Sequence, residues 1–213
     1  MKTVAVLVGS LSEHSINRTL ARTFEKLANG RLRFNYLPIG ELPFYNNDLW
    51  SNPPAVVTDM KARVEAADAV LIVMPEFNRS FPAIIKNALD WGSRPYGDNS
   101  WADKPLALAG ASPGGIGTAA GQNQLRATLP LLGFVVMGQP EVYFQFKPGL
   151  IDENLEVTDE QSHAFLAGFV DKFVAWIDRH GEQRQTAHRG RVGRRVCPSA
   201  SPHWGSFCIK LSR

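Results

Sequence analysis

The chain has 213 residues, of which 44% are hydrophobic, a content that allows one sizeable buried core and predicts a single folded domain. The net charge of +3 is uneven, because residues 179–213 hold 8 of the 23 Lys and Arg residues and one acid, Glu182. Residues 1–178 therefore carry 15 basic and 19 acidic residues, a net of −4, which gives no ground for nucleic-acid binding by the body of the chain.

Two further features indicate a cytoplasmic protein without membrane contact. Both cysteines, Cys197 and Cys208, lie near the C-terminus, so the body has no disulfide framework and suits a reducing compartment. The N-terminal sequence MKTVAVLVGS carries only a short apolar run. A secretory signal needs roughly 7–15 apolar residues and a membrane span about 20, so neither is expected here.

Residues 1–91 alternate short apolar runs with amphipathic segments. In chain order they predict a strand at 3–8, a helix that ends near Asn29-Gly30, a strand at 31–37, a loop at 40–54, a helix at 54–67, a strand at 69–74 and a helix at 82–91. Pro82 suits a first helical turn, where no N–H is needed, and we expect Ser80 to cap that turn.

Residues 92–180 continue this alternation after a polar loop at 92–103. They predict a strand at 105–109, a helix that opens at 112–117 and runs through Leu132, a strand at 134–137 that 142–146 extends or accompanies, and a helix at 158–180. This order predicts a flavodoxin-like three-layer α/β fold: a five-stranded parallel sheet, order 2-1-3-4-5, with helices on both faces.

The C-terminal residues 182–213 follow neither the helical nor the strand period and are rich in Arg, Ser, Gly and Pro. We expect a domain at 1–181 followed by a basic, disordered tail, either out of frame or added to the natural sequence. An arm that binds nucleic acid or a membrane is the alternative for this segment.

Three polar turns follow the first, third and fourth predicted strands, and a sheet of this order brings them to one edge. The first turn combines hydroxyls, an amide and the free N–H groups of a helix start, from Ser10, Ser12, Ser15, Ile16 and Asn17. Such a cluster suits a phosphate monoester, although plain helix capping is the alternative. No P-loop motif occurs.

The second and third turns suit a flat ligand. Residues 76–79 offer backbone donors, an aromatic ring and a cation, although an ordinary polar loop between a strand and a helix is the alternative interpretation. Residues 112–117 contain three glycines, which let the backbone approach a ligand closely because they carry no side chains. A phosphate site beside these two turns describes a cradle for flavin mononucleotide (FMN).

The segments GSLSEHSIN, PEFNRSFPAIIKNALDW and SPGGIG, in this order and spacing, resemble the NADPH-dependent FMN reductase family, which includes quinone, chromate and azo-dye reductases. The resemblance covers residues 1–180 and implies that Ser10, Ser15 and Asn17 hold the FMN phosphate. It further implies a flavin ring bordered by Pro75, Glu76, Phe77, Asn78 and Arg79, with the pocket completed by Ser112, Gly114 and Gly115. Ser12 stands where many members carry Arg, and Phe77 where Tyr is common.

The resemblance also implies an activity. NADPH or NADH would stack on the flavin, and two electrons would pass through flavin N5 to quinones, chromate, azo compounds or free flavin, with no catalytic side chain. It implies a homodimer or homotetramer, with the 92–103 loop near the interface. A non-enzymatic flavodoxin-type electron carrier, which shares the fold and the cofactor, is the competing class.

Other motifs predict different chemistry more weakly. Residues 110–114 match the G-x-S-x-G elbow of a serine hydrolase, but Pro113 lacks the N–H that the oxyanion hole needs. Residues 115–120 match a dinucleotide fingerprint, yet they follow the fourth strand rather than the first. No spacing indicates a metal site, and His14 reads as a solvent-facing residue. Trp91 is expected in the core, and Trp101 in a more open setting, at a substrate pocket or subunit contact.

Overall fold

The computed structural model describes residues 1–192, with side chains described through residue 181; the rest of the predicted tail, residues 193–213, lies outside the described part. Its sheet contains β1 (Lys2–Val8), β2 (Leu32–Tyr36), β3 (Ala69–Val73), β4 (Pro105–Ser112), β5 (Val135–Val136) and β6 (Val142–Gln145). The main helices are α1 (Ile16–Ala28), α2 (Ala55–Ala66), α3 (Ala83–Gly92), α4 (Ala119–Thr128) and α5 (Glu160–Val192), with short 3₁₀ turns at Ile39–Glu41, Asn47–Ser51 and Pro130–Leu132.

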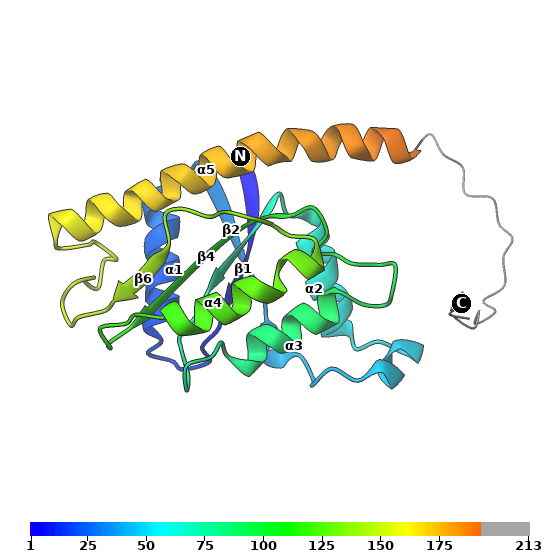
Figure 1. Cartoon of the computed structure of the whole chain (residues 1–213), viewed down its shortest axis with the longest axis horizontal. Helices are drawn as coiled ribbons and strands as arrows, with labels where there is room; N and C mark the ends of the chain where they lie inside the picture. The colour runs from blue at the N-terminus through cyan, green and yellow to red at the C-terminus, as the bar shows by residue number, and fades with distance from the viewer. Residues whose placement is uncertain (193–213) are drawn as a thin grey trace, which may run out of the picture.

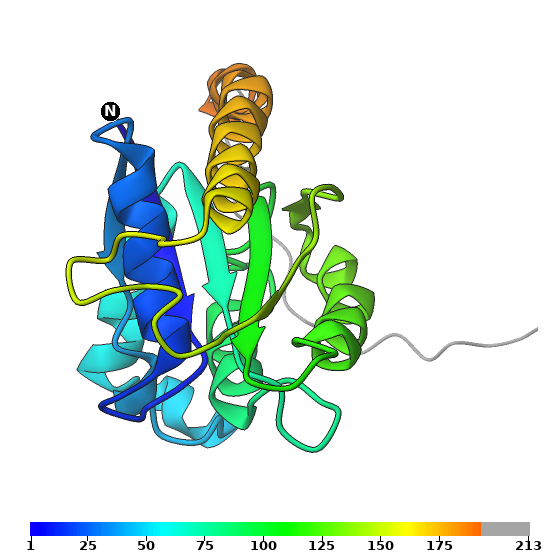
Figure 2. The same ribbon diagram turned by 90° about the vertical axis from the view of Figure 1, so that its left-hand side faces the viewer.

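All pairings in the sheet are parallel, in the order β2-β1-β3-β4-β5, which confirms the predicted flavodoxin-like fold. The fifth position is shared by two short strands. β5 pairs with the start of β4 at Pro105 and Leu106, and β6 pairs with its end from Ala109 to Ser112. Figure 2 shows the strand arrows pointing toward one edge, so the loops after β1, β3 and β4 meet there.

Helices cover both faces of the sheet because the strands are buried on both faces. Alternate residues of β1 face opposite ways: Val4 and Val6 pack with α1 and α5, whereas Ala5 and Leu7 pack with α2 and α3. Figure 1 shows α5 along one side of the sheet and α3 on the other. The three layers hold the carboxyl ends of the strands in fixed relative positions.

Two helix boundaries differ from the sequence-based expectation. Ser80 does not cap α3: the cap position is Pro82, without a side-chain bond, and Ser80 Oγ instead donates to Gln124 Oε1 at 2.8 Å. The prediction was wrong because the turn before α3 directs Ser80 toward α4. Helix α5 continues to Val192, past residue 180, where the predicted helix ended. As predicted, α1 ends at Asn29, which is left-handed with φ 46°.

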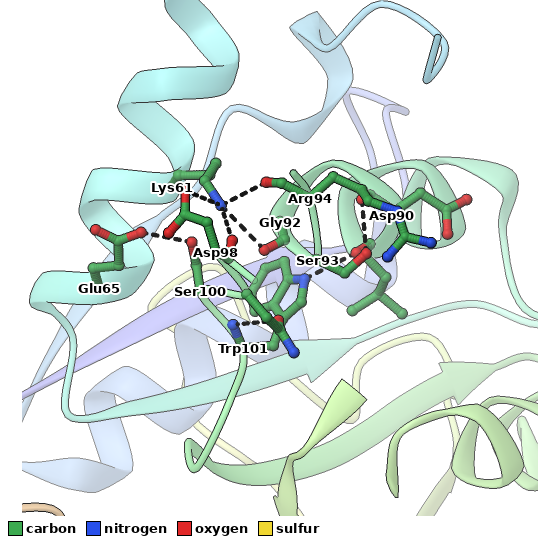
Figure 3. A network of polar contacts seen from close by, with 11 residues as sticks. Lys61, Glu65, Asp90, Gly92, Ser93, Arg94, Asp98, Ser100 and Trp101 are labelled. Atoms are coloured by element: carbon green, nitrogen blue, oxygen red, sulfur yellow. Dashed lines mark hydrogen bonds and ion pairs between the residues drawn. The ribbon is translucent and has the colours of Figure 1, made fainter. Parts of the chain in front are cut away.

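Lys61 on α2 organises the polar 92–103 loop, as Figure 3 shows. Its Nζ donates to the backbone oxygens of Arg94 at 2.8 Å and Asp98 at 2.7 Å, and more weakly to that of Gly92 at 3.4 Å. The Lys61 side chain is only 8% exposed, so its charge is stabilised by hydrogen bonds to these carbonyls and by the Asp98 carboxylate at 3.6 Å.

Trp101, in the same loop, is fully buried, which corrects the expectation of an open setting. Its Nε1 donates to the Leu89 carbonyl at 2.9 Å, and its ring lies against Phe134 with centroids 5.4 Å apart. The ring occupies the space beside Gly92, where a Cβ would lie 2.3 Å from it. Trp91 is buried in the core, as expected, and its Nε1 donates to the Pro43 carbonyl at 2.8 Å.

Within residues 1–192 no helix has the length and apolar character to cross a membrane.

Candidate functional site

A cavity of about 270 Å³ lies where the loops after β1, β3 and β4 meet. The first loop contributes Ser10, Ser12, His14, Ser15, Ile16 and Asn17 to its lining. The second contributes Pro75, Glu76 and Phe77, and the third contributes Ala111, Ser112 and Pro113. The structure thus brings together nine of the thirteen residues predicted for the site; Asn78, Arg79, Gly114 and Gly115 lie outside the lining.

The first loop presents the N-terminus of α1 to this cavity. Ser15 is the cap residue, and its Oγ accepts a hydrogen bond from the Arg18 N–H at 3.2 Å, so the hydroxyl proton stays available as a donor. The N–H groups of Ile16 and Asn17 open the helix and have no carbonyl partner within it. The first turn of α1 holds no acid. This end of the helix therefore favours an anion.

Asn17 connects the first loop to the third. Its Nδ2 donates to the Ala111 carbonyl and its Oδ1 accepts from the Ala111 N–H, both at 2.9 Å. The residue is 1% exposed. Both ends of the side-chain amide are engaged with β4, which leaves the second Nδ2 hydrogen and the backbone N–H of Asn17 for a ligand. Its side chain fixes the distance between the helix start and the end of β4.

The second loop is a two-residue hairpin turn. The N–H of Phe77 donates to the Ser80 carbonyl at 3.0 Å, and the N–H of Ser80 to the Phe77 carbonyl at 2.9 Å. The two central residues, Asn78 and Arg79, have φ of 51° and 65°. Positive φ at both positions defines a type I′ turn, a conformation that disfavours Arg. The turn leaves the Phe77 ring 56% exposed beside the cavity.

Glu76 anchors this turn to α4. Its Oε2 accepts from the Gly121 N–H at 3.0 Å, and its Oε1 lies 3.7 Å from the Arg79 guanidinium. A Cβ at Gly121 would lie 2.9 Å from the Ser80 carbonyl oxygen, so the helix and the turn pack backbone against backbone. Glu76 therefore positions the turn, while Asn78 and Arg79 are exposed outside the cavity.

The third loop leaves β4 at Ser112. Ser112 Oγ accepts from the Gly114 N–H at 3.2 Å, and Gly114 and Gly115 are exposed just beyond it. Gly117 has φ 63°, and a Cβ there would lie 2.6 Å from the Tyr143 carbonyl oxygen, so this position requires glycine. In the described part of the chain no histidine is hydrogen-bonded to Ser112, which leaves the hydrolase interpretation without a general base.

Three lining residues, His14, Ala111 and Pro113, were not predicted for the site, and His14 is the one among them with a polar side chain. It is exposed, as expected, but it also lines the cavity, where it is the one residue with a basic side chain. Nothing in the sequence distinguished it from any loop histidine. The cavity otherwise combines neutral donors at a helix N-terminus with an exposed aromatic ring, Phe77, and the surface formed by Pro75 and Pro113.

Replacing Ser15 by alanine is expected to weaken FMN binding about tenfold and to lower the free energy of unfolding by about 1 kcal/mol, because the helix cap and a predicted phosphate donor are lost together. Riboflavin, which lacks the phosphate, should bind the variant and the natural protein alike. Fluorescence titration and denaturant unfolding measure the two effects.

Asp159→Ala is the capping control: it removes a carboxylate that accepts from the Ser162 N–H in the first turn of α5, and it should leave FMN affinity unchanged. An equal loss of riboflavin and FMN affinity in Ser15→Ala would place the phosphate elsewhere.

The parallel sheet, the anion-favouring start of α1 and the three converging loops define a flavodoxin-like protein with a site of the FMN-binding type. Comparison with known proteins identifies its family. Residues 1–149 match the family model for NADPH-dependent FMN reductases, so the chain belongs to that family.

Individual relatives agree. A 2-hydroxy-1,4-benzoquinone reductase from Burkholderia sp is 43% identical over 174 residues, which cover 82% of this chain and 95% of that protein. A quinone reductase from Escherichia coli (strain K12) is 37% identical over 184 residues, 83% of this chain and 95% of the relative. The solved structure of FerB, a flavoenzyme NAD(P)H:(acceptor) oxidoreductase from Paracoccus denitrificans, superposes with a TM-score of 0.83 at 51% identity, covering 84% of this chain and 99% of FerB.

The family model, the relatives and the structural neighbour all describe oxidoreductases, and this chain shares that activity. It is an enzyme, an FMN-dependent NAD(P)H oxidoreductase, and the interpretation as a non-enzymatic electron carrier is set aside. A flavodoxin from Pseudomonas aeruginosa superposes with a TM-score of 0.52 at 19% identity, which reflects the shared fold alone.

Proposed function

We propose that this chain reduces quinones, using electrons from NADH or NADPH and an FMN held in the cavity between the three loops. The observation that carries the proposal is the convergence of a bare helix N-terminus, an exposed aromatic ring and the end of β4 on one cavity. The quinone reductases from Burkholderia sp and Escherichia coli support the choice of acceptor. Chromate, azo compounds and free flavin are further predicted acceptors.

The residues present fit FMN at both ends of the cavity. The hydroxyls of Ser10 and Ser15 and the N–H groups of Ile16 and Asn17 would hold the phosphate, with His14 and Ser12 at its rim. Pro75, Glu76 and Phe77 would border the ring system on one side, and Ser112, Gly114 and Gly115 on the other, while Asn78 and Arg79 shape the turn. When bound, FMN supplies the group that accepts two electrons from nicotinamide and passes them on.

The role of the protein in this chemistry is to bind and orient. Asn17 and Glu76 fix the spacing of the three loops through Ala111 and Gly121, so that phosphate and ring are held at once. Backbone N–H groups of the third loop would stabilise the negative charge that bound flavin gains on reduction. The described site offers no side chain placed as a nucleophile, and the proposed reaction needs none.

Anaerobic stopped-flow mixing tests the proposal. Protein loaded with FMN should lose its yellow absorbance within seconds of mixing with NADPH or NADH, and added benzoquinone should restore it. Flavin that stays yellow for minutes would contradict a reductase, and reduced flavin that quinone fails to reoxidise would contradict the acceptor.

We also propose that the chain forms a homodimer or homotetramer in the cytoplasm. Tyr96 is 96% exposed and Leu131 is 90% exposed, and their segments are joined by a hydrogen bond from Asn99 Nδ2 to the Leu132 carbonyl at 2.9 Å. Large apolar side chains gathered on neighbouring exposed loops favour a subunit contact. Light scattering should give two or four times the 23.5 kDa of one chain, and a monomer at micromolar concentration would contradict this.

A further inference from the structure

The hairpin turn beside the flavin cavity is strained at Arg79. This residue has φ 65°, in the left-handed region, at a position of the type I′ turn where glycine is the usual residue. Any other residue there costs free energy, because its Cβ lies too close to the following carbonyl oxygen. Residues held in such conformations gather at functional sites. The strain therefore points to a function of the arginine side chain.

Helix α4 holds the turn in this strained form. Gln124 Nε2 donates to the Arg79 carbonyl at 2.8 Å, and Gln124 Oε1 accepts from Ser80 Oγ at 2.8 Å. At the start of the turn, the Gly121 N–H donates to Glu76 Oε2 at 3.0 Å. None of these contacts uses the side chain of Arg79, so a glycine at this position would keep them all. The turn is thus a fixed support that holds the Arg79 backbone in place.

The Arg79 guanidinium is exposed and only weakly paired. The side chain is 66% exposed, and its one ion-pair partner within the described residues is Glu76 Oε1 at 3.7 Å, beyond hydrogen-bond distance. The Glu76 carboxylate is 9% exposed and already accepts from the Gly121 N–H. Because Glu76 lines the flavin cavity, its distance from Arg79 places the guanidinium at the rim of that cavity. The positive charge is therefore available to a ligand at the rim.

Phe77, two residues earlier in the same turn, adds an apolar surface. Its ring is 56% exposed and lines the same cavity. A flat acceptor that approaches a bound flavin from solvent can pack against this ring. The one basic side chain of the cavity lining, His14, belongs to the first loop, at the end assigned to the phosphate. The turn thus offers an aromatic face and a cation together, at the end assigned to the flavin ring.

We propose that Arg79 determines specificity for the acceptor by favouring quinones that carry a negative charge, from an ionised hydroxyl, carboxylate or sulfonate group, over neutral quinones. The inference rests on the proposed function and adds the charge of the acceptor to it. The quinone gains two electrons from reduced FMN and two protons, one from the reduced flavin and one from water, and leaves as the hydroquinone while FMN is oxidised. Arg79 takes no part in this transfer, and its charge stabilises the bound anion.

The test is a ratio of two reoxidation rates. FMN-loaded protein is reduced by an equivalent of NADH without oxygen and mixed, in a stopped-flow instrument, with 1,4-naphthoquinone-2-sulfonate or with neutral 1,4-naphthoquinone. The second-order rate constant for the sulfonate, divided by that for the neutral quinone, should fall about fivefold in Arg79→Gln. Salt at about 1 M, where the Debye length is about 3 Å, should lower the ratio of the natural protein to that of the variant.

Arg79→Gly separates the strain from the charge. It should lower the ratio as much as Arg79→Gln does, while its Tm rises by about 2–4 °C, because glycine adopts positive φ without strain. Arg79→Gln retains the strain and should keep the natural Tm.

Each effect has a matched control. Asn29→Gly relieves positive φ at an exposed residue that does not line the flavin cavity, so it should raise the Tm and leave the ratio unchanged. Arg33→Gln removes an exposed cation of β2 that also lies outside the cavity lining, and it should leave the ratio unchanged as well.

A natural ratio in both Arg79 variants would overturn the proposal. So would variants in which NADH reduces the flavin more slowly while the ratio stays natural, since Arg79 would then serve the electron donor. Reduced natural protein that neither quinone reoxidises would contradict the proposed function, and with it the inference. The failure of the inference alone, with both quinones reduced at a ratio that ignores Arg79, is a different result.

Discussion

Replacing Asn17 by aspartate is expected to weaken FMN binding about a hundredfold and to destabilise the fold by about 3 kcal/mol. Aspartate can still accept from the Ala111 N–H, but its second oxygen would face the Ala111 carbonyl, which now receives a hydrogen bond at 2.9 Å. The residue is 1% exposed, so a carboxylate there is poorly solvated. Its charge would also lie beside the helix N-terminus assigned to the phosphate, where a second anion is repelled.

Fluorescence titration with FMN and denaturant unfolding of the flavin-free protein measure the two effects of Asn17→Asp. Riboflavin affinity should fall less than FMN affinity, because only FMN carries the repelled phosphate. Asn47→Asp, which adds the same charge at an exposed position in a 3₁₀ turn, is the matched control and should leave both quantities nearly unchanged. A folded Asn17→Asp protein with natural FMN affinity would contradict the position given to the phosphate.

Replacing Lys61 by methionine is expected to lower the free energy of unfolding by about 3 kcal/mol, corresponding to a fall of roughly 6–12 °C in Tm. Methionine retains the apolar stem but leaves the carbonyls of Arg94 and Asp98 without the Lys61 donor, whereas the Gly92 carbonyl keeps the Ser100 N–H at 2.9 Å. The loop that contains Trp101 would lose one of its attachments to α2 and keep the hydrogen bond from Ser100 Oγ to Glu65 Oε1 at 2.7 Å (Figure 3). FMN affinity should change less than threefold, because none of these groups lines the flavin cavity.

Thermal unfolding followed by circular dichroism checks this prediction. Lys86→Met is the matched control: Lys86 is half exposed and pairs with Asp90 four residues on at 2.7 Å, so its loss should cost about 0.5 kcal/mol. Equal Tm values for the two variants would show that the carbonyl contacts of Lys61 add nothing to stability.

Much of the fold was predictable because its parallel strands are buried on both faces. Residues 69–73 are all buried, so they form an uninterrupted apolar run that is easy to recognise. The left-handed end of α1 at Asn29 and the cap at Ser15 follow from local residue preferences. The meeting of three loops follows from strand order, which in turn follows from the alternation of strands and helices.

The remaining features depend on contacts between residues far apart in the chain. The hydrogen bonds between Asn17 and Ala111 join residues 94 positions apart, so the sequence indicated a phosphate ligand at Asn17 but not this link to β4. Trp101 stands in a polar segment, and only the space beside Gly92 shows that it is buried. The type I′ turn at Asn78-Arg79 lacks the glycine that normally marks it.

A second cavity, of about 500 Å³ at the carboxyl ends of β1 and β2, was also beyond prediction from the sequence. Arg18 and Arg22 have the spacing of any solvated helix face. Their relation to residues 36–41 exists only once β2 pairs beside β1, which places the end of β2 next to the first loop. Local sequence thus identifies helix caps and strands. Residues far away in the chain determine which partner a polar side chain contacts.

The start of α1 is the proposed site of the FMN phosphate, and the rest of the proposed flavin site depends on that position. Equilibrium dialysis of the flavin-free protein against FMN and against riboflavin tests this directly. We predict one FMN bound per chain and riboflavin at least tenfold weaker, because the Ser15 hydroxyl and the first N–H groups of α1 contribute only to FMN. Protein that binds neither flavin, or both equally, would contradict it.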